Sequence, residues 1–212
     1  MLTMPGAVVL GGGRGDRIGG FKPLIELAGR SLISYVVEAA MKVSDEVVVV
    51  VGRDEEAVAI RDIISSSVKV VVDVIPGRGP MVGFCSGLRH LRSEYAAALP
   101  CDSPLLNAEA LRYLFGRGEG ADAAIPIWPN GYIEPLHGVY RVSAALEGCE
   151  AAVGGGELRM SSMIGRLEEV IYVPVEDLKR YDPELLTFLN INDREDLVAA
   201  EAVLRSRGQP ES

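Results

Sequence analysis

The sequence has few residues that could cross-link the chain or hold a transition metal. Its 212 residues include three cysteines, two histidines and one tryptophan. Cys85, Cys101 and Cys149 form no C-x-x-C pair, and neither histidine lies near a pair of cysteines, which excludes the usual zinc motifs. An odd number of thiols fits a reducing compartment, so we expect a cytoplasmic protein with three buried, unpaired cysteines.

The sequence also lacks long apolar segments and an excess of positive charge. No run of about 18 uncharged apolar residues is present, and residues 1–5 have neither the basic region nor the apolar core of a secretory signal. Acidic residues outnumber basic ones by 30 to 21, which gives a net charge of −9. We therefore expect neither a membrane nor a nucleic acid as a partner. A small phosphorylated ligand is compatible with this charge, because it needs only a local pocket of positive potential.

Apolar runs alternate with helical patterns along the first 128 residues. The runs are typical of strands buried on both faces of a parallel sheet, and they cover residues 6–10, 47–51, 68–72, 95–99 and 121–127. Between them, apolar residues recur at helical spacing in segments that begin near Ser31, Asp54, Met81 and Asn107. This alternation predicts an α/β fold with a single doubly wound, mostly parallel sheet.

The pattern changes after residue 128, where prolines interrupt it. Residues 133–142 read as a small extended region, and Ser161 or Ser162 is the candidate cap of a short helix. Asp193, with Asp196 three residues later, predicts the start of the last helix. We expect one domain over residues 1–206, followed by a polar tail at 207–212.

The clearest chemical signal follows the first predicted strand. The segment from Leu10 to Pro23 reads L-G-G-G-R-G-D-R-I-G-G-F-K-P. Consecutive glycines let backbone N–H groups approach an anion, and Arg14, Arg17 and Lys22 add three cations. Because ligands of open α/β sheets bind beyond the carboxyl ends of the strands, the segment predicts a polyphosphate site. Its spacing fits neither the P-loop nor the dinucleotide-binding fingerprint, and a surface turn with solvated charges is the alternative.

This segment resembles the opening motif G-G-x-x-x-R-[MI]-G, followed closely by Lys, of the GT-A-like nucleotidyltransferases, in particular the molybdenum cofactor guanylyltransferases (MobA family). The resemblance implies a Rossmann-like nucleotidyltransferase fold in which the strand end and glycines hold the nucleotide, while Arg and Lys hold its phosphates. The matching positions are Leu10, Gly11, Gly12, Gly13, Arg17 and Lys22. Two departures are visible: Gly11 replaces a common Ala, and the stretch up to Lys22 is one residue shorter, with Phe21 where an acidic residue often stands.

A candidate metal ligand follows the apolar run at 95–99. Asp102 lies in the segment P-C-D-S-P, just beyond the carboxyl end of a predicted strand. Nucleotidyl transfer from a triphosphate needs a divalent ion, and Mg²⁺ prefers carboxylate oxygens near substrate phosphates. The motif C-D-x-P is similar to the family motif whose Asp binds magnesium. The alternative is a turn-forming Asp that accepts hydrogen bonds from its own backbone.

Three further residues are implied as nucleotide or metal contacts. The segment from Asp73 through G-P-M-V-G resembles the family's D…G-P-L-A-G, which implies that Asp73 and Gly79 contact the nucleotide. The family's Asn after the second strand has no match here, and Arg53 is a candidate contact or a surface charge. Residues 190–197 resemble the family's N-x-N-t-p-e-D-L, so Asn192 is either a ligand of the ion or phosphates or a turn residue.

Two downstream segments are similar to the acceptor side of the molybdenum family. Residues 134–140 match E-P-L-x-x-[VL]-Y, and residues 156–164 match a loop with the pattern G-x-x-R followed by apolar residues. The resemblance implies that Arg159 binds the acceptor's phosphate and that His137 positions the acceptor. A surface charge and a core histidine are the respective alternatives.

The resemblance implies a complete reaction. GMP passes from GTP to the terminal phosphate of the molybdopterin (molybdenum) cofactor, pyrophosphate leaves, and a guanine dinucleotide cofactor forms, with Mg²⁺ as the metal and with Lys22, Arg17 and Asp102 as the catalytic residues. Other proteins of cofactor biosynthesis or molybdoenzymes are implied as further partners. The alternatives are a cobinamide-phosphate guanylyltransferase, a cytidylyltransferase of the same superfamily, and a noncatalytic nucleotide-binding adaptor.

Overall fold

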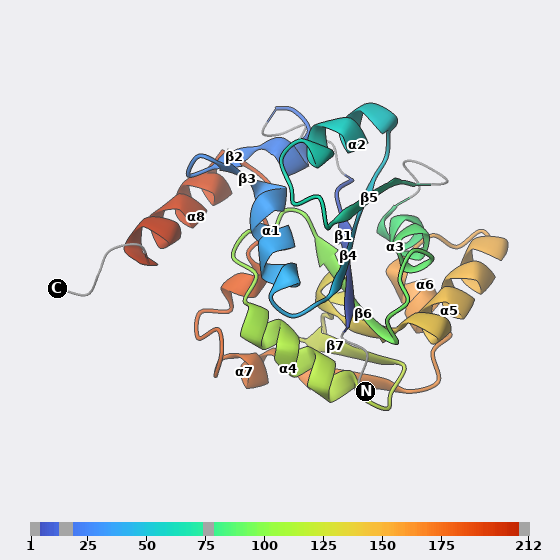
Figure 1. The fold of residues 1–212 in the computed structure, drawn as a ribbon. Helices are drawn as coiled ribbons and strands as arrows, with labels where there is room; N and C mark the ends of the chain where they lie inside the picture. Colours follow the sequence, from blue (N-terminus) through green and yellow to red (C-terminus); the bar gives the residue numbers. More distant parts are fainter. Residues whose placement is uncertain (1–4, 13–18, 74–78, 208–212) are drawn as a thin grey trace.

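A central sheet of seven strands organises the computed structural model, which describes residues 5–12, 19–73 and 79–207 (Figure 1). The strand order is β5-β4-β1-β6-β8-β7-β9. The strands are β1 (Gly6–Leu10), β4 (Glu46–Val51), β5 (Lys69–Val72), β6 (Tyr95–Pro100), β7 (Ala123–Ile127), β8 (Val139–Arg141) and β9 (Val170–Pro174). All neighbouring pairs are parallel except those of β8, which runs antiparallel to β6 and to β7. The predicted fold class is confirmed, and each predicted strand segment overlaps one of the observed strands.

Helices cover both faces of this sheet, as Figure 1 shows. On one face, the apolar core joins the strands to α1 (Leu32–Met41), α2 (Asp54–Arg61) and α4 (Ala108–Gly118). On the other face, a second core joins them to α3 (Pro80–Leu88), α5 (Val142–Gly154) and α6 (Met160–Ile164). None of the helices in the described ranges is long and apolar enough to cross a membrane.

The remaining elements lie at the edges of the two cores. A short hairpin of β2 (Glu26–Leu27) and β3 (Arg30–Ser31) packs with the last helix, α8 (Arg194–Arg207), around a third apolar cluster. The other elements among the described residues are three 3₁₀ turns and one short helix: η1 (Lys22–Leu24), η2 (Pro135–His137), η3 (Leu186–Phe188) and α7 (Val175–Leu178).

The valine run of β4 shows why the central strands are apolar throughout. Side chains alternate between the two faces of a strand. Val47, Val49 and Val51 accordingly join the core under α1, α2 and α4, whereas Val48 and Val50 join the core under α3 and α5. A strand with a helical layer on each side has no solvent-facing position to fill with polar residues.

The region after residue 128 differs from its prediction. Of the extended segment predicted at 133–142, only β8 is a strand, because η2 precedes it and Val142 already begins α5. Helix α5 escaped prediction because it is rich in small residues, which give a weak apolar stripe. One of them, Gly148, needs to be small: a Cβ there would lie 3.2 Å from the carbonyl oxygen of Met163 in α6.

The predicted boundaries of the last two helices have different outcomes. Helix α6 begins after Arg159, so Ser161 and Ser162 lie inside it and the prediction that one of them caps it is wrong. The predicted start of α8 is confirmed. Asp193 Oδ1 accepts hydrogen bonds from the backbone of Glu195 and Asp196, both at 3.0 Å, and Asp196 Oδ2 accepts one from the Asn192 backbone at 2.7 Å. Helix α8 includes residue 207, whereas 208–212 of the predicted tail lie outside the described residues.

Helix α3 lies very close to β1 and β4, and a glycine makes this approach possible. A Cβ on Gly87 would lie 2.9 Å from one methyl carbon of Val8, closer still to the other, and 3.0 Å from a methyl carbon of Val50. Because these methyl groups belong to buried strands, they cannot move aside without repacking the core. The spacing between α3 and the sheet therefore depends on this glycine.

We expect Gly87→Ala to lower the free energy of unfolding by about 1–3 kcal/mol, the usual cost of overfilling a packed core. Gly116→Ala in α4 is the matched control, because no other group lies within 4 Å of the added methyl group. That control should raise the free energy of unfolding by up to about 1 kcal/mol through better helix propensity. Urea unfolding of both variants measures the difference, and equal effects would contradict the packing role of Gly87.

Candidate active site

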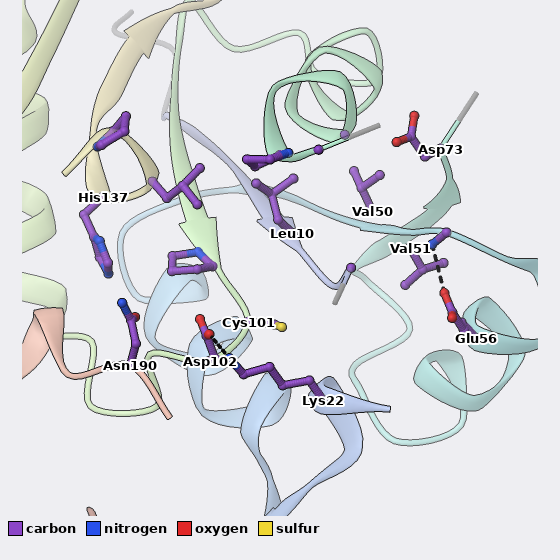
Figure 2. A pocket seen from close by; sticks show the side chains of 18 of the residues that line it. Leu10, Lys22, Val50, Val51, Glu56, Asp73, Cys101, Asp102, His137 and Asn190 are labelled. Atoms are coloured by element: carbon purple, nitrogen blue, oxygen red, sulfur yellow. Dashed lines mark hydrogen bonds and ion pairs between the residues drawn. The ribbon is translucent and has the colours of Figure 1, made fainter. Parts of the chain in front are cut away.

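The order of the strands places a crevice beyond the carboxyl ends of β1 and β6. From β1 the chain moves outward to β4 and β5, and β6 then returns to the opposite side of β1. Such a reversal of strand order leaves the loops on either side of it diverging, and ligands of open α/β sheets bind there. A cavity of about 810 Å³ lies at this point (Figure 2).

Three polar residues from distant parts of the sequence meet at this crevice: Lys22 and Asp102 line the cavity, and Asn192 lies beside them. The Lys22 ammonium group forms an ion pair with the Asp102 carboxylate and donates a hydrogen bond to Asn192 Oδ1 at 3.2 Å. The side chains of Lys22 and Asp102 are only 14% and 17% exposed. The structure thus brings together the predicted phosphate-binding lysine and both predicted metal ligands.

Backbone hydrogen bonds explain why Asp102 lies beside the end of β1. Cys101 N donates to the carbonyl oxygen of Leu10 at 3.2 Å, which extends the pairing of β6 with β1 by one residue. Ile191 N then donates to the carbonyl oxygen of Asp102 at 2.8 Å. The first bond holds the C-D-x-P turn beside the glycine segment. The second holds residues 190–192 beside the C-D-x-P turn.

The described part of the glycine segment continues directly from β1. Gly11 N donates to the carbonyl oxygen of Val50 at 2.8 Å, and a Cβ on Gly11 would lie 3.1 Å from a Val51 methyl carbon. Gly12 has open space around its Cβ position and, together with Leu10, lines the cavity. The other residues predicted in this segment, Gly13, Arg14 and Arg17, lie outside the described residues.

The predicted nucleotide contacts Asp73 and Gly79 lie at one end of the cavity. Asp73 follows β5, and its Oδ1 accepts a hydrogen bond from Ser86 Oγ at 2.7 Å. Gly79 has φ of +95°, a conformation that side chains rarely adopt, and it precedes the first residue of α3. The N-terminus of α3 therefore faces the cavity.

Two further residues line the same end of the cavity: Arg53, predicted as a contact or a surface charge, and Glu56, which was not predicted. Glu56, in the first turn of α2, lines the cavity, and its Oε2 accepts a hydrogen bond from Gly52 N at 2.9 Å. Arg53, the residue before α2, also lines it with a side chain that is 58% exposed. The signal that could have found Glu56 is its place three residues after Arg53, the position from which a glutamate reaches back over a helix start.

The opposite end of the cavity is formed by the segment before β8. Tyr132, Glu134 and His137 line it, and the Tyr132 side chain is 62% exposed. Glu134 Oε1 accepts a hydrogen bond from Trp128 Nε1 at 2.8 Å, and burial raises the pKa of this carboxyl group. This end therefore offers an aromatic ring beside a half-buried carboxyl group.

His137 is buried beneath this end of the cavity. Its Nε2 lies 3.1 Å from Ser103 Oγ, which in turn donates to Asn190 Oδ1 at 2.6 Å, and its ring packs edge-on against Phe188. Burial lowers the pKa of His137 to about 4, although the backbone of Thr187 acts in the opposite direction. The ring is therefore neutral near pH 7, when it can position groups but carries no charge.

Arg159 does not line the cavity. It is an exposed residue at the start of α6, and its neighbour Leu158 places a carbonyl oxygen 3.5 Å from the Cβ position of Gly79. Arg159 thus lies near the rim, on the side of α3.

No group of three or more His, Cys, Asp or Glu side chains that could hold a metal ion occurs in the described ranges. The donor set around Asp102, one carboxylate and the Asn192 amide, still fits Mg²⁺, which usually completes its shell with water and substrate phosphates.

The sequence of the chain also matches a known family. Residues 7–170 match the model of the MobA-like NTP transferase domain. The chain belongs to this family. The predicted resemblance and the predicted enzyme class, a nucleotidyltransferase, are thereby confirmed.

Relatives and a solved structure support this assignment over nearly the whole chain. A probable molybdenum cofactor guanylyltransferase of Methanosarcina mazei is 33% identical over 90% of this chain and 87% of its own. Another of that name, from Thermococcus kodakarensis, is 35% identical over 96% and 97%. Molybdopterin-guanine dinucleotide biosynthesis protein A of Archaeoglobus fulgidus superimposes with a TM-score of 0.81 at 32% identity, covering 95% of this chain and 99% of that one.

In this MobA-like NTP transferase, the buried histidine makes stability depend on pH. The folded pKa of His137 is about 4, against an ordinary value of 6.5, so the unfolded chain takes up the proton first as the pH falls. The free energy of unfolding therefore decreases between pH 6.5 and pH 4, by up to about 3 kcal/mol from this residue. We expect His137→Gln, whose amide can still bond to Ser103, to unfold with a weaker dependence on pH. Urea unfolding at pH 7 and at pH 4.5 measures this, and parallel losses in both proteins would contradict it.

Proposed function

We propose that the protein transfers GMP from GTP to the terminal phosphate of the molybdopterin cofactor, releasing pyrophosphate. The observation that carries the proposal is the meeting of Lys22 and Asp102 beside the glycine segment at the point where the strand order reverses. Membership of the MobA-like family and the names of its relatives support the choice of reaction. No observation favours cobinamide phosphate as the acceptor or a noncatalytic role.

The nucleotide is proposed to lie across the ends of β1, β4 and β5. Its phosphates would lie over the glycine segment and near Lys22, the described cation closest to the Asp102 carboxylate. Its nucleoside would extend toward Asp73 and the N-terminus of α3 at Gly79, where the floor of the cavity is apolar. Gly13 and Arg17 are proposed as further phosphate contacts on the resemblance of their motif alone.

The acceptor is proposed to occupy the opposite end of the cavity. Tyr132 offers an exposed ring to the flat pterin group, and Glu134 offers a carboxylate to its N–H donors. His137 keeps its neighbours Ser103 and Asn190 in place beneath them. Arg159 lies near the rim beside Gly79, away from Tyr132 and Glu134, so its contact with the acceptor's phosphate is proposed on the resemblance of its motif alone.

The two substrates would react in the middle, near Lys22. An oxygen of the acceptor's terminal phosphate attacks the α-phosphorus of GTP, a new P–O bond forms, and the bond to the bridging oxygen breaks. Pyrophosphate leaves with that oxygen and its charge. Because a phosphate monoester is already ionised near pH 7, no general base is needed, and the low pKa of His137 is compatible with its position. Catalysis then rests on positioning and on charge stabilisation by Lys22 and Arg17.

Magnesium fits this arrangement through Asp102, with Asn192 as a second oxygen donor beside it. When bound, the ion neutralises negative charge on the α-phosphate and on the departing pyrophosphate. The ion pair with Lys22 holds the Asp102 carboxylate at the centre of the crevice before substrates arrive. Asp102 and Lys22 therefore depend on each other for their placement.

The proposed compartment is the cytoplasm. Cys85, Cys101 and Cys149 are all free and buried, as predicted, which suits a reducing environment. Proteins that supply the cofactor or receive the dinucleotide are proposed as further partners, on the resemblance alone.

Asp102→Asn tests the metal site. The amide keeps the size and one oxygen of the side chain but removes the charge that a hard divalent ion prefers. We expect turnover to fall by roughly 100-fold or more, and the magnesium concentration for half-maximal turnover to rise. Pyrophosphate release across a magnesium titration measures both quantities.

The matched control for this test is Asp62→Asn, an exposed position just after α2 and outside the cavity. It removes the same charge and should leave both quantities unchanged. If Asp102→Asn instead turns over like the control at low magnesium, Asp102 is a turn residue and the proposed metal site is wrong.

A further inference from the structure

At the nucleoside end of the cavity, one oxygen of the Glu56 carboxylate accepts no hydrogen bond from the described residues. Glu56 Oε2 accepts a hydrogen bond from Gly52 N, whereas no donor to Oε1 is found among the described residues. Each carboxylate oxygen can accept two hydrogen bonds, so the group retains most of its capacity. The proposed reaction gives this group no role.

The position of Glu56 determines which part of a nucleotide could reach it. Figure 2 shows Glu56 on the same side of the cavity as Asp73, with His137 on the opposite side and the Lys22–Asp102 pair between them. With phosphates near Lys22, the negative charge of Glu56 would repel them. What extends past Lys22 in this direction is the nucleoside.

The surface beside Glu56 suits a flat ring. Leu10, Val50 and Val51 line this part of the cavity with apolar side chains. Gly83 of α3 also lines it, without a side chain of its own to narrow the space. A base lying on this floor would present its polar edge to the wall formed by the start of α2, where Glu56 is anchored.

The chemistry of a carboxylate selects among bases. Guanine presents two neighbouring donors on its pairing edge, the N1–H group and the 2-amino group, and one carboxylate can accept from both. Adenine and cytosine present an amino group beside a ring nitrogen whose lone pair would face the carboxylate oxygens. The carboxylate would attract the pairing edge of guanine and repel those of adenine and cytosine, so it would favour the correct base and disfavour the other two.

We infer that Glu56 reads the guanine base and is the residue that makes the site specific for GTP over CTP and ATP. The inference rests on the proposed function, which puts the nucleoside at this end of the cavity. Glu56 also satisfies an N–H group at the start of α2, and the two roles are compatible because they use different oxygen lone pairs.

Glu56→Gln separates the two roles. The Gln carbonyl oxygen can still accept from Gly52 N, so the start of α2 keeps its hydrogen bond. The second oxygen becomes an NH₂ group, which would point a donor at the two donors of guanine. The matched control is Glu55→Gln, which removes the same charge one residue earlier, from a side chain that is 74% exposed and does not line the cavity.

The experiment measures equilibrium binding of GTP, ITP, CTP and ATP to the wild type and to both variants, with magnesium present. ITP differs from GTP only in that its base lacks the 2-amino group. We expect the wild type to prefer GTP over ITP by about tenfold or more, the usual effect of one hydrogen bond to a charged group. Glu56→Gln should bind GTP at least tenfold more weakly and lose the preference, and Glu55→Gln should keep both.

The outcomes distinguish this inference from the function on which it rests. If the wild type binds GTP and Glu56→Gln keeps the same ratio of GTP to ITP affinity, Glu56 only caps the helix and the inference alone is wrong. If the wild type binds ITP as tightly as GTP, the 2-amino group is not read, and if it binds ATP as tightly as GTP, the base is not read at all; either result overturns the inference. If it binds no GTP, the proposed function fails first. Equal melting temperatures of the two variants confirm that the comparison reports on the site.

Discussion

The pairing of β1 with β6 is the constraint on which the candidate site depends. It puts the end of the glycine-bearing strand at Leu10 directly beside the turn that carries Asp102, and it creates the reversal of strand order that opens the cavity. A one-residue shift in register would turn every side chain of these buried strands toward the wrong layer. Because both faces of the sheet are packed, the register of the strands is strongly specified. The register in turn determines the positions of the site residues at the strand ends.

The helical layers then decide what surrounds the cavity. Helix α3 can approach β1 closely because Gly87 leaves room for valine methyl groups, and this brings Gly79 and the helix N-terminus to the site. Helix α2 follows β4 after a short turn and places Glu56 on the same side. The opposite wall comes from the antiparallel β8 and the turn before it, so the two ends of the cavity are built from different parts of the chain.

The sequence predicts the parts of this site in which one residue type has one physical use. Buried valine runs fall in this class. The glycine segment and Asp102 each also fit a plain turn, and their common place beyond strand ends predicts the meeting of Lys22 and Asp102 that the structure shows. The spacing of Glu56 from Arg53 indicates a helix start but not a ligand contact, because an acid in the first turn of a helix already has an electrostatic reason to be there. Helix α5 was missed because its small residues are explained only by the neighbour they pack against, which the sequence alone does not reveal.

The most direct test of the proposed function uses the wild-type protein with GTP and magnesium and varies only the acceptor. With molybdopterin cofactor, we expect one pyrophosphate for each guanine dinucleotide formed, and no pyrophosphate above background without an acceptor. Quantifying pyrophosphate and identifying the product by mass settles both points. Pyrophosphate release with cobinamide phosphate but not with molybdopterin cofactor would contradict the proposed acceptor, and unconsumed GTP with both would contradict the proposed reaction.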